Sequence, residues 1–547
     1  MSKKEVTQIF SGGQVVVEQL KKENVKYVFG LIGSATMELF DALYDEKKIR
    51  FIDVRDERTG THIADGYARA SGNVGIIVAG QNGPGATNLV TGIAQANAAF
   101  SPVISIAGAI ATEHKGKNAF QEIDQQALFE PITKKTFSIS KTNLIPKTIN
   151  QAFSLALSSR QGPVHINIPR DILANKSNFS NFKIHKIKKF NKINKKDLKK
   201  IIDLLTISKK PVIVAGGGIK NSENHKEVVK FASFLNIPIV SSAGHADAIP
   251  FDQKLYAGQM GPRGNPIASS LIRQADLILA LGTRLGFNST FYSYDNINKK
   301  AKIIQIDADP ISIGRYFPVT IGLCCDVKEL INKLNLLIKK NTQLPDCKPW
   351  TDIFLKQKND YHKELNTHAD INSIPIQPSG LFKKLRDILP SNSAITLDAG
   401  TLCLQATDML NYSNPRTFFT PLDFGLVGFS FACGLGVKLA KPEIPVFSLM
   451  GDGGFGMTIS ELSTAVHHNI NTITLIMNNN SWGAEKAYQR DFFNKRYIGS
   501  DLKNPPFHKI AELYGAKGYK VNKLLDLEKT IQAALSCNKP AVINIEV

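Results

Sequence analysis

The sequence predicts an α/β protein with three doubly wound parallel-sheet domains. Short apolar runs, each about as long as a buried strand, alternate with longer helical stretches along the whole chain. Glycine-rich turns follow several of these runs, which is typical of strands that lead into helices in parallel sheets. The chain has 547 residues, of which 43% are hydrophobic and 21% charged, so it is long enough for about three domains with sizeable cores.

The first predicted domain covers residues 1–180, and its expected strands lie at 25–29, 50–54, 74–78, 103–106 and 164–168. A lysine-rich segment over residues 183–200 leads into a second domain at 195–340, with strands at 211–214, 237–240, 277–281 and 302–306. A polar stretch over residues 339–378 leads to the third domain at 375–547, with strands at 394–397, 446–450, 473–477 and 541–545. The chain shows no short repeat.

The net charge of +20 does not indicate a nucleic-acid-binding protein. Much of the lysine excess lies in the segment 183–200, which carries no RNA-binding signature and is expected to be a solvated linker. Six cysteines without CxxC or metal-ligand spacing favour a reducing compartment. The N-terminus lacks the apolar core of a signal peptide, and no apolar run approaches the roughly 18 residues of a membrane span. We therefore expect a cytoplasmic protein with neither nucleic-acid nor membrane partners.

Asp452 and Asn479 form the most informative pair in the chain. Each follows a predicted strand of the third domain, and they are 27 positions apart. Ligands bind at such carboxyl ends in open α/β sheets. A carboxylate, an amide oxygen and a backbone carbonyl are ligands that suit Mg²⁺ together with phosphate oxygens. Gly453 and Gly454 let backbone N–H groups approach a phosphate at the start of the next helix. The spacing therefore predicts a site for a divalent cation and a diphosphate.

The spacing and the three α/β domains resemble the thiamine-diphosphate-dependent acetolactate synthase and pyruvate oxidase superfamily. The resemblance covers essentially the whole chain. It implies a first domain that binds the aminopyrimidine, a central Rossmann-like domain and a third domain that binds the diphosphate. It also implies thiamine diphosphate and Mg²⁺ as cofactors, and a homodimer or homotetramer in which each active site draws on two subunits.

In the first domain, Glu57 is the expected catalytic carboxylate. It follows a strand, and the motif at 65–69, DGYAR, comes soon after, as in this family. A carboxylate on the aminopyrimidine drives the tautomer that deprotonates the thiazolium carbon, and an apolar cleft would raise its pKa. Many members of the family have histidine before this glutamate, whereas this chain has Asp56. The loops at 81–88 (QNGPGATN) and 120–122 (FQE) add further expected active-site residues, namely Gln81, Asn82, Gly83, Pro84 and Gln121.

In the third domain, the resemblance assigns the backbone carbonyl of Ser481 to the metal, beside Asp452 and Asn479. Val427 falls where the family places the apolar residue that bends the cofactor. The other expected cofactor contacts are Asp398, Gly400, Thr401, Gly453, Gly454 and Trp482. In the central domain, acetolactate synthases often carry a segment associated with FAD. This chain reads FNS there, at 287–289, so we do not expect bound FAD.

The substrate is expected to be a small anionic 2-oxo acid or sulfonated aldehyde. The segments 482–486 (WGAEK) and 491–497 (DFFNKRY) are most similar to sulfoacetaldehyde acetyltransferases, in which sulfite leaves and phosphate takes the acetyl group. Glu485 would shuttle a proton there, and Lys486 or Arg490 would pair with the anion.

Two alternatives stay open. The motif GPGATN at 83–88 and the end of the chain at Val547, on the last strand, favour an acetolactate synthase acting on pyruvate. A non-catalytic, cofactor-binding subunit is the alternative of another class, and the presence of Glu57, Asp452 and Asn479 argues against it.

Overall fold

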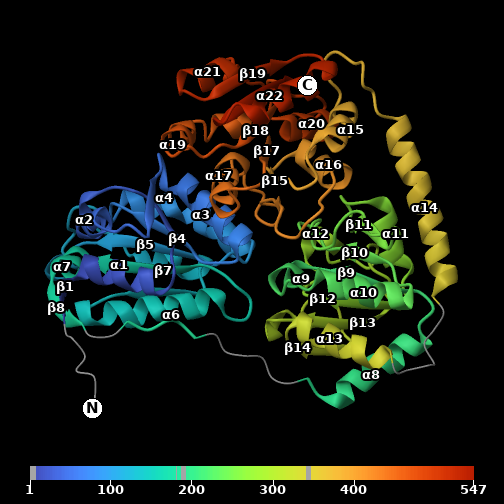
Figure 1. Cartoon of the computed structure of the whole chain (residues 1–547), viewed down its shortest axis with the longest axis horizontal. Helices are drawn as coiled ribbons and strands as arrows, with labels where there is room; N and C mark the ends of the chain where they lie inside the picture. Colours follow the sequence, from blue (N-terminus) through green and yellow to red (C-terminus); the bar gives the residue numbers. More distant parts are fainter. Residues whose placement is uncertain (1–7, 180–181, 187–192, 340–346) are drawn as a thin grey trace.

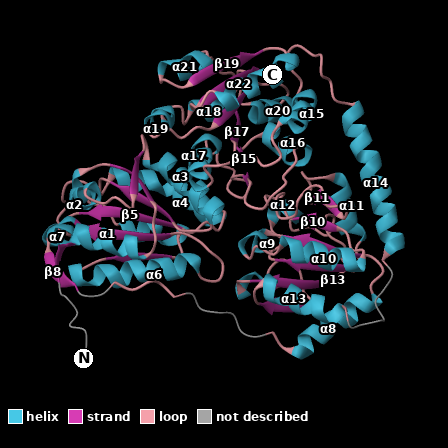
Figure 2. Cartoon of the chain, in the orientation of Figure 1, coloured by secondary structure: helices cyan, strands magenta, loops and turns pink. Residues whose placement is uncertain are grey.

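The protein contains three six-stranded parallel sheets (Figure 1). The computed structural model describes residues 8–179, 182–186, 193–339 and 347–547. Each sheet falls inside one of the three predicted segments, and helices cover the sheets (Figure 2). The structure confirms the predicted fold class. The exact domain boundaries stay predictions.

The N-terminal domain has the strand order β3-β2-β4-β5-β7-β6. Its strands are β2 (Tyr27–Leu31), β3 (Arg50–Asp53), β4 (Gly75–Ala79), β5 (Val103–Ala109), β6 (Lys135–Ser138) and β7 (Val164–Pro169). Its helices are α1 (Gly12–Lys22), α2 (Met37–Tyr44), α3 (Glu57–Ser71), α4 (Pro84–Ala98), α5 (Gln125–Phe129), α6 (Ile145–Leu157) and α7 (Arg170–Ala174). A separate antiparallel pair joins β1 (Gln8–Ser11) to β8 (Lys176–Phe179).

The central domain has the order β11-β10-β9-β12-β13-β14. Its strands are β9 (Pro211–Ala215), β10 (Ile239–Ser241), β11 (Tyr256–Gln259), β12 (Leu277–Leu281), β13 (Lys302–Asp307) and β14 (Ile321–Cys324). Its helices are α8 (Lys195–Ile207), α9 (Gly217–Asn221), α10 (His225–Leu235), α11 (Pro266–Gln274), α12 (Phe287–Thr290) and α13 (Val327–Ile338). Helix α14 (Lys348–Thr367) then runs along one side toward the C-terminal domain (Figure 1).

The C-terminal domain has the order β16-β15-β17-β18-β20-β19. Its strands are β15 (Ala394–Leu397), β16 (Phe418–Phe419), β17 (Val446–Gly451), β18 (Ile473–Asn478), β19 (Lys517–Val521) and β20 (Ala541–Glu546). Its helices are α15 (Pro378–Ile388), α16 (Thr401–Met409), α17 (Ser430–Ala440), α18 (Asp452–Gly456), α19 (Glu461–His467), α20 (Gly483–Phe492), α21 (Phe507–Leu513) and α22 (Leu527–Ser536).

The interior strands are apolar on both faces because helices cover both sides of each sheet. In β4, Ile76 and Val78 pack with α1, α2 and α6, whereas Ile77 and Ala79 face the core formed with α3 and α4. This is the continuous apolar pattern expected of buried parallel strands. The predicted strands are confirmed, with ends shifted by up to three residues.

Helices α3 and α17 join the N-terminal and C-terminal domains in backbone contact. A Cβ atom added at Gly66 would lie 2.2 Å from the carbonyl oxygen of Cys433, and one added at Gly436 would lie 1.9 Å from that of Ile63. Side chains larger than hydrogen therefore do not fit at these two positions. The close crossing brings the carboxyl end of the N-terminal sheet beside the C-terminal domain, where the predicted site residues lie.

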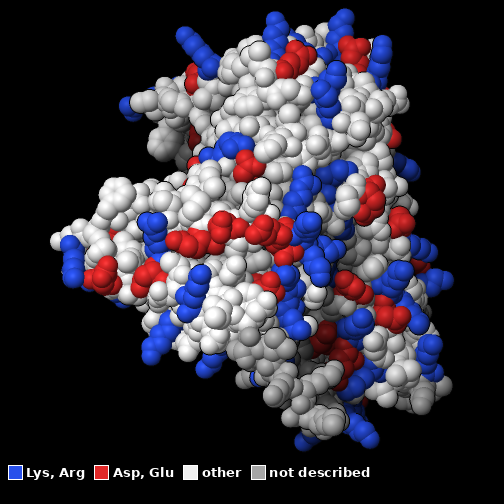
Figure 3. All heavy atoms as spheres, turned by 60° about the vertical axis from the view of Figure 1, so that its left-hand side comes forward, with Lys and Arg blue, Asp and Glu red and all other residues white. Residues whose placement is uncertain are grey.

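Two linker predictions meet the structure differently. The lysine-rich segment ends in α8, which begins at Lys195, and residues 187–192 with three of the predicted lysines lie outside the described residues. The polar stretch after residue 339 contains the helix α14, which the sequence analysis did not predict. On the face shown in Figure 3, basic side chains lie interspersed with acidic ones. Among the described residues, no helix is long and apolar enough to cross a membrane.

Candidate active site

Glu57 opens helix α3 directly after strand β3. Asp56 caps the helix, because its side chain accepts hydrogen bonds from the backbone N–H groups of Arg58 and Thr59. The Glu57 residue is only 3% exposed, and Oε2 accepts a 3.1 Å hydrogen bond from Nδ2 of Asn88 on α4. Burial raises the pKa of Glu57, and the hydrogen bond from Asn88 opposes that rise. A protonated carboxyl group is therefore favoured here more than on the protein surface.

The glycine-rich loop before α4 lies against both Glu57 and the loop of Gln121. A Cβ added at Gly85 would lie 2.9 Å from Oε1 of Glu57, so glycine permits the close approach of the carboxylate. Nδ2 of Asn82 donates to the carbonyl oxygen of Gln121 at 3.1 Å. Gln121 has φ of +62°, a conformation that is uncommon for residues other than glycine. The structure thus brings these predicted residues together, with Pro84 at the start of α4 and Gln81 next to Ser34.

Asp452 lies at the junction of β17 and α18, as the sequence predicted. The residue is 1% exposed, and burial raises the pKa of its carboxyl group. Oδ2 accepts a 2.5 Å hydrogen bond from Nδ2 of Asn504. Asn504 was missed by the sequence analysis, because it is 52 positions away and carries no motif of its own.

Asn479 and Ser481 follow the neighbouring strand, β18. Oδ1 of Asn479 accepts hydrogen bonds from the backbone N–H of Ser481 at 3.1 Å and from its hydroxyl at 3.0 Å. β17 and β18 pair in parallel, so Asp452 and Asn479 emerge at the same edge of the sheet. Oxygen donors from a carboxylate, an amide and a main-chain carbonyl are the chemistry that a hard divalent cation requires. The residues therefore fit the predicted metal.

Glycines line the start of α18 beside these ligands. A Cβ added at Gly453 would lie 2.5 Å from the ring of Trp482, and one at Gly454 would lie 2.3 Å from Oδ2 of Asp398. Gly451 has open space where a Cβ would lie. Trp482 and Asp398 thus occupy the space that side chains would need at Gly453 and Gly454, whereas the backbone at Gly451 is open.

The carboxylate of Asp398 is bound by backbone N–H groups of nearby residues, and its contact with the diphosphate stays a prediction. Its oxygens accept 3.0 Å hydrogen bonds from the backbone N–H groups of Gly428, Phe429 and Ala399. Burial raises the pKa of Asp398 to about 6, although these N–H donors favour the charged form. Asp398 therefore fixes the loop that carries the half-buried Val427. Gly400, with φ of +127°, and Thr401 are both exposed at the start of α16.

The predicted substrate residues lie on α20. Glu485 is exposed. Nζ of Lys486 forms a 2.5 Å ion pair with Asp501 and lies 5.6 Å from the centre of the Tyr497 ring. Lys486 therefore already forms an ion pair with a nearby residue. To pair with a substrate anion, it must either leave Asp501 or bind both groups.

The two groups of residues lie in adjoining domains of the chain. Arg58 donates to the carbonyl oxygen of Met457 at 3.0 Å, and Oε1 of Glu461 accepts from the hydroxyl of Thr59. Among the residues that the structure describes, no hydrogen bond or ion pair links the Glu57 carboxylate to Asp452 or Asn479. Within one chain, the residues around Glu57 and the residues around Asp452 and Asn479 thus form two separate constellations.

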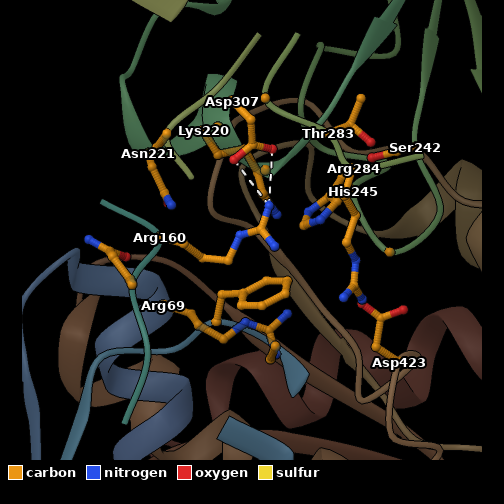
Figure 4. A pocket seen from close by; sticks show the side chains of 18 of the residues that line it. Arg69, Arg160, Lys220, Asn221, Ser242, His245, Thr283, Arg284, Asp307 and Asp423 are labelled. Atoms are coloured by element: carbon orange, nitrogen blue, oxygen red, sulfur yellow. Dashed lines mark hydrogen bonds and ion pairs between the residues drawn. The ribbon is translucent and has the colours of Figure 1, made fainter. Parts of the chain in front are cut away.

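A hollow of about 300 Å³ lies where the three domains meet. Figure 4 shows Arg160 reaching from the N-terminal domain to Asp307 of the central domain, and Arg284 pointing to Asp423 of the C-terminal domain. The nitrogen–oxygen distance is 3.0 Å in both ion pairs. The charges of the two arginines are therefore partly balanced by Asp307 and Asp423. The expectation that this central region holds no FAD stays a prediction.

Comparison with family models covers all three domains. The N-terminal TPP binding domain of thiamine pyrophosphate enzymes matches residues 10–128. The central domain of these enzymes matches residues 198–334, and the C-terminal TPP binding domain matches residues 398–545. These matches include every predicted site residue from Glu57 to Lys486.

Curated relatives match along nearly the full length. The probable acetolactate synthase large subunit of Methanococcus aeolicus is 32% identical, over 98% of this chain and 92% of its own. The acetolactate synthase large subunit of Buchnera aphidicola subsp. Schizaphis graminum is 34% identical, over 96% and 92%. The sulfoacetaldehyde acetyltransferase of Alcaligenes xylosoxydans xylosoxydans is 32% identical, over 97% and 92%. The chain therefore belongs to the thiamine pyrophosphate enzyme family.

Proposed function

We propose that this thiamine-diphosphate-dependent enzyme also requires Mg²⁺ and transfers an acyl fragment from a small anionic carbonyl compound. The observation that carries the proposal is the pair of strand ends at β17 and β18. They place the buried Asp452 carboxylate and the Asn479 amide at one sheet edge, next to the glycine-rich start of α18.

In this proposal Asp452, Asn479 and the carbonyl of Ser481 hold the cation, and the start of α18 at Gly453 and Gly454 binds the diphosphate. Trp482 and the loop of Val427 contact the rest of the cofactor. When bound, thiamine diphosphate supplies a nucleophilic carbanion that adds to a carbonyl group. The other steps depend on how the protein orients the substrate and moves protons.

Glu57 would hold a proton against a ring nitrogen of the aminopyrimidine. Its burial suits this role because a raised pKa makes the carboxyl group hold a proton more readily than an exposed glutamate does. Asn88 fixes the carboxylate orientation through its hydrogen bond to Oε2. Gln81 and Gln121 would face the substrate from the neighbouring loops.

Sulfoacetaldehyde with phosphate as acceptor is our first candidate reaction. The segments 482–486 and 491–497 support it, because they resemble the corresponding pattern of sulfoacetaldehyde acetyltransferases. In the overall reaction a carbon–sulfur bond breaks and sulfite leaves with the bonding electrons. A phosphate oxygen bonds to the acetyl carbon, so no outside oxidant is required.

An acetolactate synthase reaction on pyruvate is the second candidate. The loop GPGATN at 83–88 favours it, and so do the relatives named acetolactate synthase large subunits. In that reaction carbon dioxide leaves one pyruvate, and the remaining two-carbon fragment joins a second 2-oxo acid.

A product assay separates the two candidates. The purified protein with Mg²⁺ and thiamine diphosphate is given either sulfoacetaldehyde plus phosphate or pyruvate alone. Sulfite with acetyl phosphate supports the first candidate, and acetolactate with carbon dioxide supports the second. If both mixtures remain unchanged while the cofactor binds, the non-catalytic alternative gains support. The visible absorption of the same preparation tests the expectation that FAD is absent.

A further inference from the structure

The side-chain amide of Asn504 lies within hydrogen-bond distance of three polar side chains at the proposed metal site. Nδ2 of Asn504 donates to Oδ2 of Asp452 at 2.5 Å and lies 3.3 Å from Oδ1 of both Asn478 and Asn480. Asn478 in turn donates through Nδ2 to Oδ1 of Asn544 on β20, at 3.1 Å. A continuous set of hydrogen bonds therefore runs from β20 through Asn478 and Asn504 to Asp452.

The backbone around Asn504 is held on both sides. Before it, residues 500–502 run antiparallel to 480–482: Trp482 N–H donates to the carbonyl of Ser500, and Leu502 N–H donates to that of Asn480, each at 2.8 Å. After it, two prolines lead into α21, whose first residue, Phe507, is 1% exposed and packs edge-on against Phe455. Asn504 therefore reaches Asp452 from a fixed position.

We propose that Asn504 is a positioning residue, which fixes the orientation of the Asp452 carboxylate for binding of the divalent cation. This inference rests on the proposed function. The amide donates a hydrogen bond to Oδ2, and this bond restricts the rotation of the Asp452 carboxylate. Outer-shell hydrogen bonds of this kind orient ligands in metal sites.

The strand geometry supports the same assignment. Asn479 bonds to Ser481, whereas its two neighbours, Asn478 and Asn480, point their side-chain oxygens to Asn504. One side of the triple-asparagine run thus carries a proposed ligand, and the other side is tied to the amide. An amide donor also adds no negative charge beside the buried Asp452, which a second carboxylate would do.

Two variants of Asn504 test the proposal: Asn504→Ala removes the side chain, and Asn504→Leu keeps its approximate volume without the donor. Mn²⁺ is titrated into each full-length protein in the presence of thiamine diphosphate, and free and bound ions are measured by electron paramagnetic resonance. We expect both variants to bind Mn²⁺ about 10- to 100-fold more weakly. We also expect a changed spectrum of the bound ion, because the Asp452 oxygens are free to rotate. Thermal unfolding without metal shows whether each variant is folded.

Two reference proteins make the outcome specific. Asn522→Ala, at an exposed asparagine of the same domain, should bind Mn²⁺ as the wild type does. Asp452→Ala should lose the site. If the wild type binds no better than Asp452→Ala, the proposed metal site itself is wrong. If Asp452→Ala loses binding while both folded Asn504 variants keep the wild-type affinity and spectrum, the positioning role is wrong and the metal site stands.

Discussion

The side-chain amide of Asn88 on α4 donates a 3.1 Å hydrogen bond to Oε2 of Glu57 at the start of α3. The two residues follow β3 and β4, which are consecutive along the chain and lie on either side of β2 in the sheet. Glu57 begins the helix after β3, and Asn88 lies in the helix after β4. The amide keeps the carboxylate oriented while burial raises its pKa. The chemistry proposed for Glu57 therefore depends on two features that can be tested separately, its proton and its environment.

Replacing Glu57 by glutamine should abolish the proton transfer and preserve the shape of the site. The amide of glutamine cannot exchange a proton with the aminopyrimidine, so hydrogen–deuterium exchange at the thiazolium carbon should slow by orders of magnitude. Nuclear magnetic resonance of the bound cofactor measures this rate. Calorimetry should show that thiamine diphosphate still binds.

A matched control is Glu130→Gln, which removes another carboxylate of the N-terminal domain at an exposed position. Its exchange rate should equal that of the wild type. An unchanged rate in Glu57→Gln would exclude Glu57 as the group that drives this deprotonation.

The raised pKa of Glu57 predicts a pH-dependent gain in stability for the same variant. A carboxyl group whose pKa is higher in the folded state stabilises the protein at pH values below its unfolded pKa, and this contribution is lost as the pH rises through the folded pKa. Glutamine has no such loss. Scanning calorimetry should therefore show Glu57→Gln gaining in Tm relative to the wild type as the pH rises from 4, below the ordinary pKa of 4.5, to 8. An equal difference at both pH values would contradict the raised pKa.

Besides the antiparallel pair β1 and β8, the strands that the sequence analysis missed are the edge strands β6, β11, β14, β16 and β19. Interior strands are buried on both faces and show as apolar runs, whereas an edge strand such as β19, which reads KGYKV, has fewer apolar residues. β16 has only two residues. Their pairing depends on the neighbouring strand, which the local sequence does not contain.

The sequence indicated candidate site residues where a polar side chain comes shortly after a predicted strand, as at Glu57, Asp452 and Asn479. Contacts set by the tertiary fold were not predicted. Asn504 reaches Asp452 across 52 positions, and Asp398 turns its oxygens to the backbone of Gly428 and Phe429. No local pattern distinguishes an asparagine that reaches a carboxylate from one in an ordinary turn before prolines.

Gly454 should not tolerate a methyl group. A Cβ there would lie 2.3 Å from Oδ2 of Asp398, which holds the loop of Val427. Gly454→Ala should therefore displace that loop, lower stability by about 1–3 kcal/mol and weaken cofactor binding. Gly456, in the same short helix, has open space at its Cβ position, so Gly456→Ala should leave both properties near the wild type. Thermal unfolding and calorimetric titration of both variants measure these effects. Equal behaviour of the two variants would refute the steric argument.

The protein should form at least a homodimer. Exposed apolar side chains lie near both constellations, among them Phe120 at 87% exposure and Phe492 at 70%. Exposed aromatic side chains of this kind are often buried in subunit contacts. Sedimentation velocity should give a dimer or tetramer, and Phe120→Ser should weaken the association. A wild-type protein that sediments as an active monomer would contradict this prediction.

The pair between Lys486 and Asp501 allows the substrate prediction to be tested with a built-in control. If Lys486 binds the sulfonate or carboxylate of the substrate, Lys486→Met should raise KM roughly 5- to 150-fold, corresponding to a loss of about 1–3 kcal/mol for a charged hydrogen bond. Cofactor binding should remain unchanged. Asp501→Asn breaks the same ion pair but leaves the cation in place, so its KM should stay equal or fall because Lys486 is released. Steady-state kinetics of both variants on the accepted substrate gives the comparison. If the two variants raise KM equally, the pair only holds the segment 486–501 together, and the substrate anion must be recognised elsewhere in the site.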